Sequence, residues 1–259
     1  MAGTAELRSA VAHARLCLES ADVSGALAQL ERALPDLASA RAAADDAVAE
    51  AATLYATLLV SADSADLAVA WAELGHSVYC TLTGPSSALS LQAQAVLGRV
   101  WTAAGDPDRA VAVYADLARR LPERLGPAHR QVFNGRADYA AALHRAGRCE
   151  SARALLAESC RAHDRVFGAA DRDGIKMLAR LGSMHRDCHD EAAADAVFTE
   201  AVRRGRKHLP ADDRLPANVS RLAAAPADPD HECRPEARAD PPAPATFGRR
   251  GRPIRWQGV

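Results

Sequence analysis

The chain has 259 residues, of which 49% are hydrophobic, 25% are charged and only 4% are aromatic. This composition is ordinary for a globular protein and excludes a chain that is disordered throughout. The formal net charge of -1 excludes a global electrostatic attraction to nucleic acid or to anionic membranes.

Alanine and leucine outnumber the β-branched and aromatic residues, which favours helices and predicts almost no sheet. The first residues, MAGTAELRSAVAHARL, have no apolar stretch typical of a secretory signal, and no segment approaches the ~20 apolar residues of a membrane span. We therefore expect a cytoplasmic protein whose cysteines are reduced thiols. The cysteines are Cys17, Cys80, Cys149, Cys160, Cys188 and Cys233.

In chain order, the apolar pattern predicts five helical hairpins. The first helices are expected near 5–19, 46–61, 88–104, 130–146 and 173–188, and the second helices near 23–35, 65–80, 107–121, 149–166 and 191–207. Several second helices follow a capping residue, such as Asp22, Asp63 or Ser64, and Asp106 with Pro107 in the first turn.

The hairpins repeat with a constant period, which is visible in three columns of equivalent positions. The first column, in the second helices, is Ala26, Ala68, Ala110, Ala152 and Ala194. The second, twelve residues earlier, is Ala14, Ala56, Gly98, Ala140 and Gly182. The third, four residues after the alanines, is Leu30, Ala72, Tyr114, Leu156 and Phe198. Small side chains at fixed positions allow two helix axes to approach closely, so the columns predict tightly stacked hairpins.

These columns resemble the tetratricopeptide repeat (TPR) over residues 5 to about 210. The 42-residue period and the loops LGPAH and FGAAD are similar to the longer variant found in kinesin light chains and many bacterial regulatory proteins. That variant often carries an Asn-Leu-Ala triplet whose asparagine holds a peptide backbone. The matching positions here are Leu54, Val96, Asp138 and Arg180, which argues against peptide capture of that type.

The resemblance implies an all-α, right-handed α-solenoid over residues 1–213 that acts as a non-enzymatic protein-interaction scaffold. The first helices would line a concave groove for a peptide or partner protein, and self-association through the open ends is an alternative. The groove positions carry more positive than negative charge in their C-terminal half, which suits an acidic partner. They are Gln92, Arg99, Thr102, Asn134, Asp138, Lys176, Arg180 and Ser183. The competing interpretation is that these residues only solvate a helix face.

Residues 214–259 are rich in Pro, Ala and Arg and are expected to be disordered, apart from a short helix near 217–225. The tail ends in a basic run that resembles the core of an AT-hook, in which Arg-Gly-Arg lies in a narrow minor groove. Its residues are Arg249, Arg250, Gly251, Arg252 and Pro253. The alternative function is therefore a DNA-associated regulatory protein, and the competing interpretation of the tail is an unstructured linker.

Cysteine and histidine also occur near one end of neighbouring predicted helices, at His144, Cys149, His185, Cys188 and His189. Thiolate and imidazole ligands suit zinc, so a zinc-binding helical protein is a further alternative. The spacing contains no CxxC pair and buried free cysteine is common, so packing is the preferred interpretation and no metal or cofactor is assigned. The chain has no GxSxG, no glycine-rich phosphate loop and no HExxH motif, and no catalytic residue is assigned.

Overall fold

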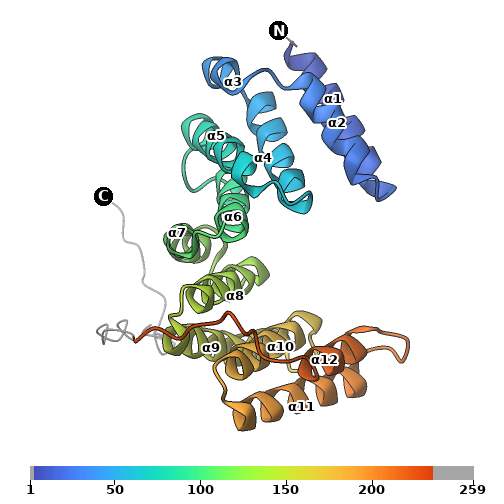
Figure 1. Cartoon of the computed structure of the whole chain (residues 1–259), viewed down its shortest axis with the longest axis vertical. Helices are drawn as coiled ribbons and strands as arrows, with labels where there is room; N and C mark the ends of the chain where they lie inside the picture. The colour runs from blue at the N-terminus through green and yellow to red at the C-terminus, as the bar shows by residue number, and fades with distance from the viewer. Residues whose placement is uncertain (1–2, 236–259) are drawn as a thin grey trace, which may run out of the picture.

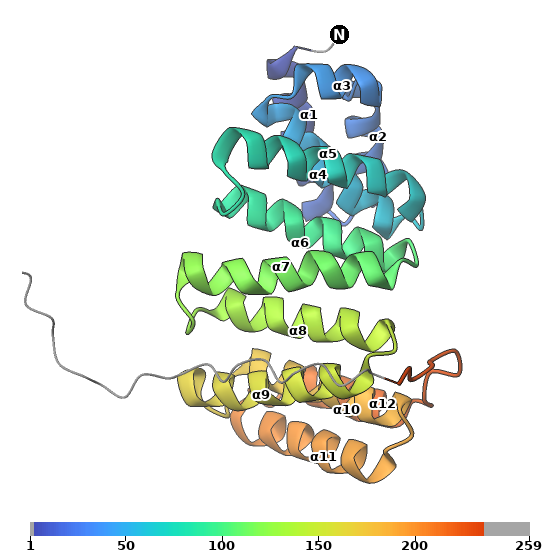
Figure 2. The ribbon, with the colours of Figure 1, turned by 90° about the vertical axis from the view of Figure 1, so that its left-hand side faces the viewer.

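The structure is a computed structural model that describes residues 3–235. In that part of the chain the fold is an array of helices without strands (Figures 1 and 2). All ten predicted helices are present, with ends within a few residues of those expected. The helices are α1 (Thr4–Glu19), α2 (Val23–Ala33), α3 (Leu37–Ala43), α4 (Asp46–Ser61), α5 (Ala65–Thr83), α6 (Ala88–Ala103), α7 (Pro107–Leu125), α8 (Arg130–Arg145), α9 (Cys149–Phe167), α10 (Arg172–Asp187), α11 (Glu191–His208) and α12 (Leu215–Ala223). None of these helices is long and apolar enough to cross a lipid bilayer.

Consecutive helices pack in pairs and form an arc (Figure 1). The first helices of the middle repeats, α4, α6 and α8, lie on the inner side of the arc, and the second helices α5, α7 and α9 lie on its outer side. The array is therefore an α-solenoid, in which each hairpin packs mainly on its neighbours.

The column residues pack as their sizes predict. Every member of the alanine column in the second helices is buried. Where the small residue of the first helix is glycine, the third column supplies an aromatic ring: a Cβ on Gly98 would lie 2.6 Å from the ring of Tyr114, and one on Gly182 would lie 3.0 Å from the ring of Phe198. Where the small residue is Ala14 or Ala140, the third column supplies leucine instead.

The turn inside each hairpin has a residue in the left-handed region at the same place in every repeat. The φ angles are positive at the equivalent residues Ala21, Asp63, Gly105, Gly147 and His189. Glycine adopts this conformation without steric cost, whereas an alanine costs roughly 1 to 2 kcal/mol there. The repeat thus fixes the turn geometry even where the sequence does not supply glycine.

Helix α3 was not among the predicted elements. Asp36 caps it by accepting hydrogen bonds from the backbone N–H groups of Ala38 and Ser39, and Ala40 is fully buried. Helix α3 lies between the first and second hairpins and packs against α5. It is too short, at 7 residues, for a clear apolar period.

The segment after the fifth hairpin also differs from the expected disordered tail. The predicted short helix is present as α12, and Leu215 and Val219 on it are buried. Residues 224–235 then run back along the solenoid without helical structure, and the backbone N–H of Arg234 donates to the carbonyl of Gly147 at 2.9 Å. We call residues 224–235 the C-terminal strap. The strap contacts residues that are distant in the sequence, so its own local composition does not reveal these contacts.

Candidate functional site

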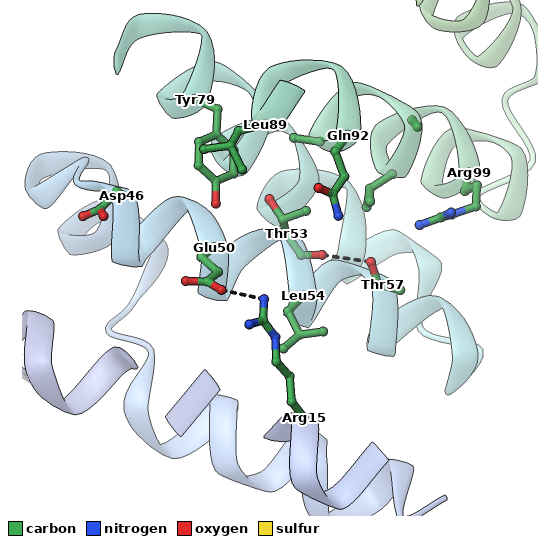
Figure 3. Close-up of a pocket in the computed structure, with 13 residues that line it drawn as sticks. Arg15, Asp46, Glu50, Thr53, Leu54, Thr57, Tyr79, Leu89, Gln92 and Arg99 are labelled. Carbon is green, nitrogen blue, oxygen red and sulfur yellow. Dashed lines mark hydrogen bonds and ion pairs between the residues drawn. The ribbon is translucent and has the colours of Figure 1, made fainter. Parts of the chain in front are cut away.

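The inner side of the arc has a hollow of about 480 Å³ in its N-terminal half (Figure 3). Three successive first helices, α1, α4 and α6, supply most of its lining, and Tyr79 comes from α5. Leu54, Leu89 and Val96 contribute apolar surface, and Leu89 is 44% exposed. The hollow can therefore accept an apolar side chain.

Charged groups surround this apolar surface, but most of them are already paired. Arg15 binds Glu50 at 2.6 Å, and Asp46 binds Arg8 at 3.0 Å. Arg99 is exposed and lines the hollow, and no ion pair joins it to any residue between 3 and 235. Gln92, about two turns earlier on α6, is also exposed (Figure 3). The hollow thus presents one guanidinium and one amide to a ligand.

A second hollow, of about 270 Å³, lies between α8 and α10 and holds the predicted residues Asn134, Asp138, Lys176 and Arg180. Arg180 binds Asp138 at 2.9 Å, and Lys176 binds Asp173 at 3.1 Å. Asp173 lines the hollow too, so two cations face two carboxylates there. The sequence interpretation counted the cations without Asp173 and expected an excess of positive charge.

Thr102 and Ser183, the remaining predicted groove residues, are half-buried. The hydroxyl of Thr102 donates to the carbonyl of Gly98 at 2.8 Å, and that of Ser183 donates to Ala179 at 3.3 Å. Both hydroxyl protons are satisfied within their own helices, which leaves only the oxygen lone pairs for a ligand.

The four positions that match the peptide-holding asparagine of the longer TPR variant all line the two hollows. Leu54 and Val96 offer no polar group, and Asp138 and Arg180 bind each other. At these four positions the face therefore offers two apolar side chains and one ion pair, and no row of amides.

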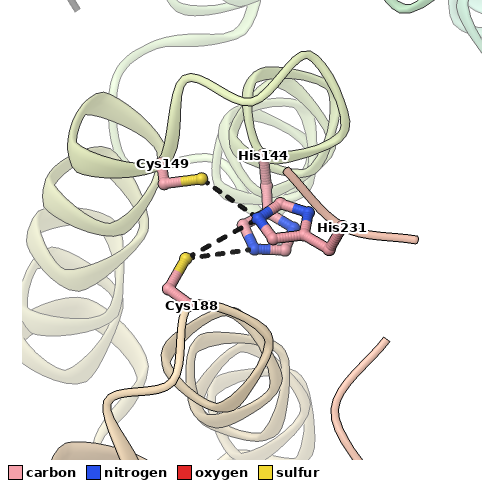
Figure 4. Close-up of side chains that lie close together, drawn as sticks. All are labelled: His144, Cys149, Cys188 and His231. Carbon is pink, nitrogen blue, oxygen red and sulfur yellow. Dashed lines mark hydrogen bonds between the residues drawn. The ribbon is translucent and has the colours of Figure 1, made fainter. Parts of the chain in front are cut away.

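The sulfur and nitrogen atoms of four further residues meet near the turns of the fourth and fifth hairpins (Figure 4). Of the five cysteine and histidine positions that the sequence singled out, His144, Cys149 and Cys188 come together. His185 is not in this group, because its Nδ1 lies 3.0 Å from the carboxylate of Asp190.

His189 is the exposed left-handed residue of the last hairpin turn, and it also lies outside the group. The fourth member is His231 of the C-terminal strap, which sequence reasoning missed. Its ring stacks on that of His144, with centroids 4.1 Å apart.

Burial shifts the pKa values of the histidine and cysteine side chains in this group. Burial lowers the pKa of His144 to about 4, with a smaller contribution from the neighbouring His231, so the imidazole is neutral at pH 7. Burial also raises the pKa of the Cys149 thiol, and the nearby Cys233 and Cys188 raise it further. Without a cation the thiols would therefore stay protonated, whereas a bound metal ion would favour the thiolates.

Cys160 and His163, which also lie close together in the sequence, are buried packing residues. His163 is fully buried, makes an edge contact with the ring of Phe133 and packs in a tilted arrangement on the ring of Phe167. The basic run Arg249 to Pro253 lies outside the described residues, so the DNA-binding alternative stays a prediction.

Solved structures similar to this fold include TPR-like repeat proteins. One is described as a putative kinesin light chain with nearly identical TPR-like repeats, from Podosopora anserina: it is 16% identical, has a TM-score of 0.68 and is matched over 82% of this chain and 100% of its own. A single-substitution variant of that protein gives a TM-score of 0.70 at 16% identity, over 80% and 98% of the two chains.

BtubC (BKLC) from P. vanneervenii is 18% identical, with a TM-score of 0.60 over 77% of this chain and 80% of its own. No protein-family model matches the sequence, and no curated protein matches it. The predicted TPR-like solenoid fold is thus confirmed by structural similarity.

Proposed function

We propose that the chain is a non-enzymatic protein-interaction scaffold that binds a partner's peptide segment in the N-terminal hollow of its inner face. The observation that carries this proposal is the position of Arg99, an exposed and unpaired guanidinium beside an apolar hollow of about 480 Å³. TPR-like solenoids present extended surfaces for protein partners, and a rigid surface loses little conformational entropy on binding.

The matching ligand carries an apolar side chain next to a carboxylate. The apolar side chain would contact Leu54, Leu89 and Val96, and the carboxylate would accept hydrogen bonds from Arg99. The C-terminal hollow contributes less selectivity for acidic partners, because its two cations are already bound to Asp138 and Asp173.

Partners captured from the native cell and identified by mass spectrometry would supply candidate peptides. Each peptide would then be titrated by fluorescence anisotropy against the full chain and against Arg99→Glu. We expect the substitution to weaken binding about tenfold or more, which corresponds to about 1.4 kcal/mol.

Arg161→Glu is the matched control, because Arg161 is also exposed and has no ion-pair partner within residues 3–235, but lies on the second helix α9. It should leave binding and the melting temperature unchanged. Equal affinities of the wild-type chain and Arg99→Glu for every partner peptide would contradict the proposed site.

A further inference from the structure

Four metal-binding side chains converge where the ends of three helices meet the C-terminal strap (Figure 4). His144 lies in the last turn of α8, Cys149 is the first residue of α9, and Cys188 directly follows α10. His231 is supplied by the strap. One ligand atom from each residue lies within 4.8 Å of the other three.

Three of the six separations between these atoms lie close to the edge of a zinc tetrahedron. Nε2 of His231 lies 3.1 Å from Sγ of Cys149 and 3.7 Å from Sγ of Cys188, and Nε2 of His144 lies 3.7 Å from Sγ of Cys188. With Zn–S bonds of about 2.3 Å and Zn–N bonds of about 2.0 Å, tetrahedral coordination separates sulfur from nitrogen by roughly 3.5 Å. Completing the site requires the longest separation, which is within 4.8 Å, to shorten by about 1 Å and the stacked rings of His144 and His231 to tilt towards one ion.

The donor set selects the metal and its role. Two thiolates and two imidazoles suit Zn²⁺, whereas Mg²⁺ and Ca²⁺ require oxygen ligands. Four protein ligands leave no open position, which is typical of structural rather than catalytic zinc. We propose that His144, Cys149, Cys188 and His231 bind one Zn²⁺ ion, which fastens the C-terminal strap to the fourth and fifth hairpins.

The surroundings of the four residues support a metal site. The backbone of Met184 lies close to the ring of His144, where the second nitrogen of a zinc-bound histidine commonly finds its hydrogen-bond partner. The strap is positioned independently on both sides of His231, because the N–H of Arg234 donates to Gly147 and the N–H of Asp228 donates to the Asp187 carboxylate at 3.2 Å.

A fifth potential ligand and an acidic hollow lie next to the four residues. Sγ of Cys233 lies 3.7 Å from Nε2 of His231 but is exposed and outside the four-atom group, so we assign it no coordination bond. A neighbouring hollow of about 370 Å³ is lined by Asp228, Asp230 and Glu232 of the strap. These carboxylates place negative charge beside the four residues, which favours the approach of a cation.

The first experiment measures metal in the full chain. Untagged protein is expressed with zinc and purified with a thiol reductant that does not bind metal. Inductively coupled plasma mass spectrometry should then find about one zinc per chain. Replacement by Co²⁺ should give the visible absorption of a tetrahedral ion together with a thiolate charge-transfer band. Zinc far below one per chain, or a Cys149–Cys188 disulfide in place of metal, would overturn the proposal.

His231→Gln is the decisive variant, because His231 lies outside the helices and its loss should leave the solenoid folded. It should lose stoichiometric zinc while the far-ultraviolet circular dichroism stays unchanged. His185→Gln is the matched control, because it changes a histidine on the same end of α10 that instead binds Asp190. Retention of zinc by His231→Gln, or its loss from His185→Gln, would contradict the assigned ligands.

The position of the ligands also predicts a change in protease sensitivity. Cleavage within residues 224–235 should be slow in the zinc-loaded protein and should accelerate when a chelator removes the metal. Cys233→Ser should behave as the wild type in both assays. Equal cleavage rates with and without zinc would show that the metal does not fasten the strap.

Discussion

Arg180 and Asp138 occupy the same position in neighbouring repeats, and their side chains form an ion pair at 2.9 Å. The pair links α10 to α8 across the inner face of the arc. Their side chains are 51% and 40% exposed, so water screens the attraction. The pair therefore sets the charge of the groove more than it stabilises the fold.

A double-mutant cycle tests that conclusion. Asp138→Asn, Arg180→Gln and the double variant should give a coupling free energy of about 0.5 kcal/mol or less, as for other exposed ion pairs. Urea denaturation followed by circular dichroism measures it. A coupling several times larger than this would mean that the pair is a structural tie between the repeats.

The contact between Gly98 and Tyr114 predicts a size-dependent loss of stability. Gly98→Ala should lower the free energy of unfolding by about 1 to 2 kcal/mol, because overpacking against the ring outweighs the roughly 1 kcal/mol that alanine gains in helix propensity. Tyr114→Leu should recover part of the loss, because the Ala140 repeat carries leucine at the equivalent position, Leu156.

Gly135→Ala serves as the control for this experiment. A Cβ at Gly135 meets only Cδ1 of Leu121 closely, at the flexible end of a side chain that can move aside. Its cost should be smaller than that of Gly98→Ala in the same urea titration. An equal cost at both glycines would show that ring contact does not explain the glycine at position 98.

Gly105 and Gly147 have the same backbone conformation. Comparing their alanine variants therefore separates the free-energy cost of the positive φ from the cost of displacing the strap. Gly105→Ala has open space around its Cβ and should cost about 1 kcal/mol through the positive φ alone. Gly147→Ala would also place its Cβ 2.7 Å from the carbonyl oxygen of Glu232, so it should cost more and weaken zinc retention. Equal effects on melting temperature and on zinc content would contradict the strap contact.

The Asp171 carboxylate predicts how stability changes at low pH. The hydrogen bond from Arg130 is the largest cause that lowers its pKa to about 2, so the unfolded chain binds this proton at a higher pH than the folded chain. The stabilisation is therefore complete above the unfolded pKa of about 3.9 and is lost as the pH falls towards 2.

Asp171→Asn keeps a residue that can cap α10, removes the negative charge and replaces one of the two oxygens that accept hydrogen bonds from Arg130. At pH 7 the variant should be less stable than the wild type by on the order of 1 kcal/mol, after allowance for the solvent exposure of Arg130. The difference should shrink between pH 4 and pH 2 in urea titrations. A difference that does not change with pH would assign the effect to the cap rather than to the charge.

The sequence predicted the solenoid because its period is carried by local features: small residues at fixed positions, capping residues and apolar helix faces. The ion pair between Asp138 and Arg180 could also have been predicted, since both belong to one column of the repeat. The proposed metal-binding group could be predicted only in part. His231 lies far from Cys149 in the sequence, in a segment without periodicity, and nothing local distinguishes it from His185 as a ligand.

The pairing of a small residue with a large one has a consequence for how such an array can lengthen. Both members, such as Gly182 and Phe198, lie within one hairpin and keep the same spacing in every repeat. A duplication of one full period that includes the hairpin therefore copies the large residue together with the small residue on which it packs. A recombination event between the two helices would instead pair an aromatic residue of one repeat with an alanine of another, and these side chains would clash in the new repeat.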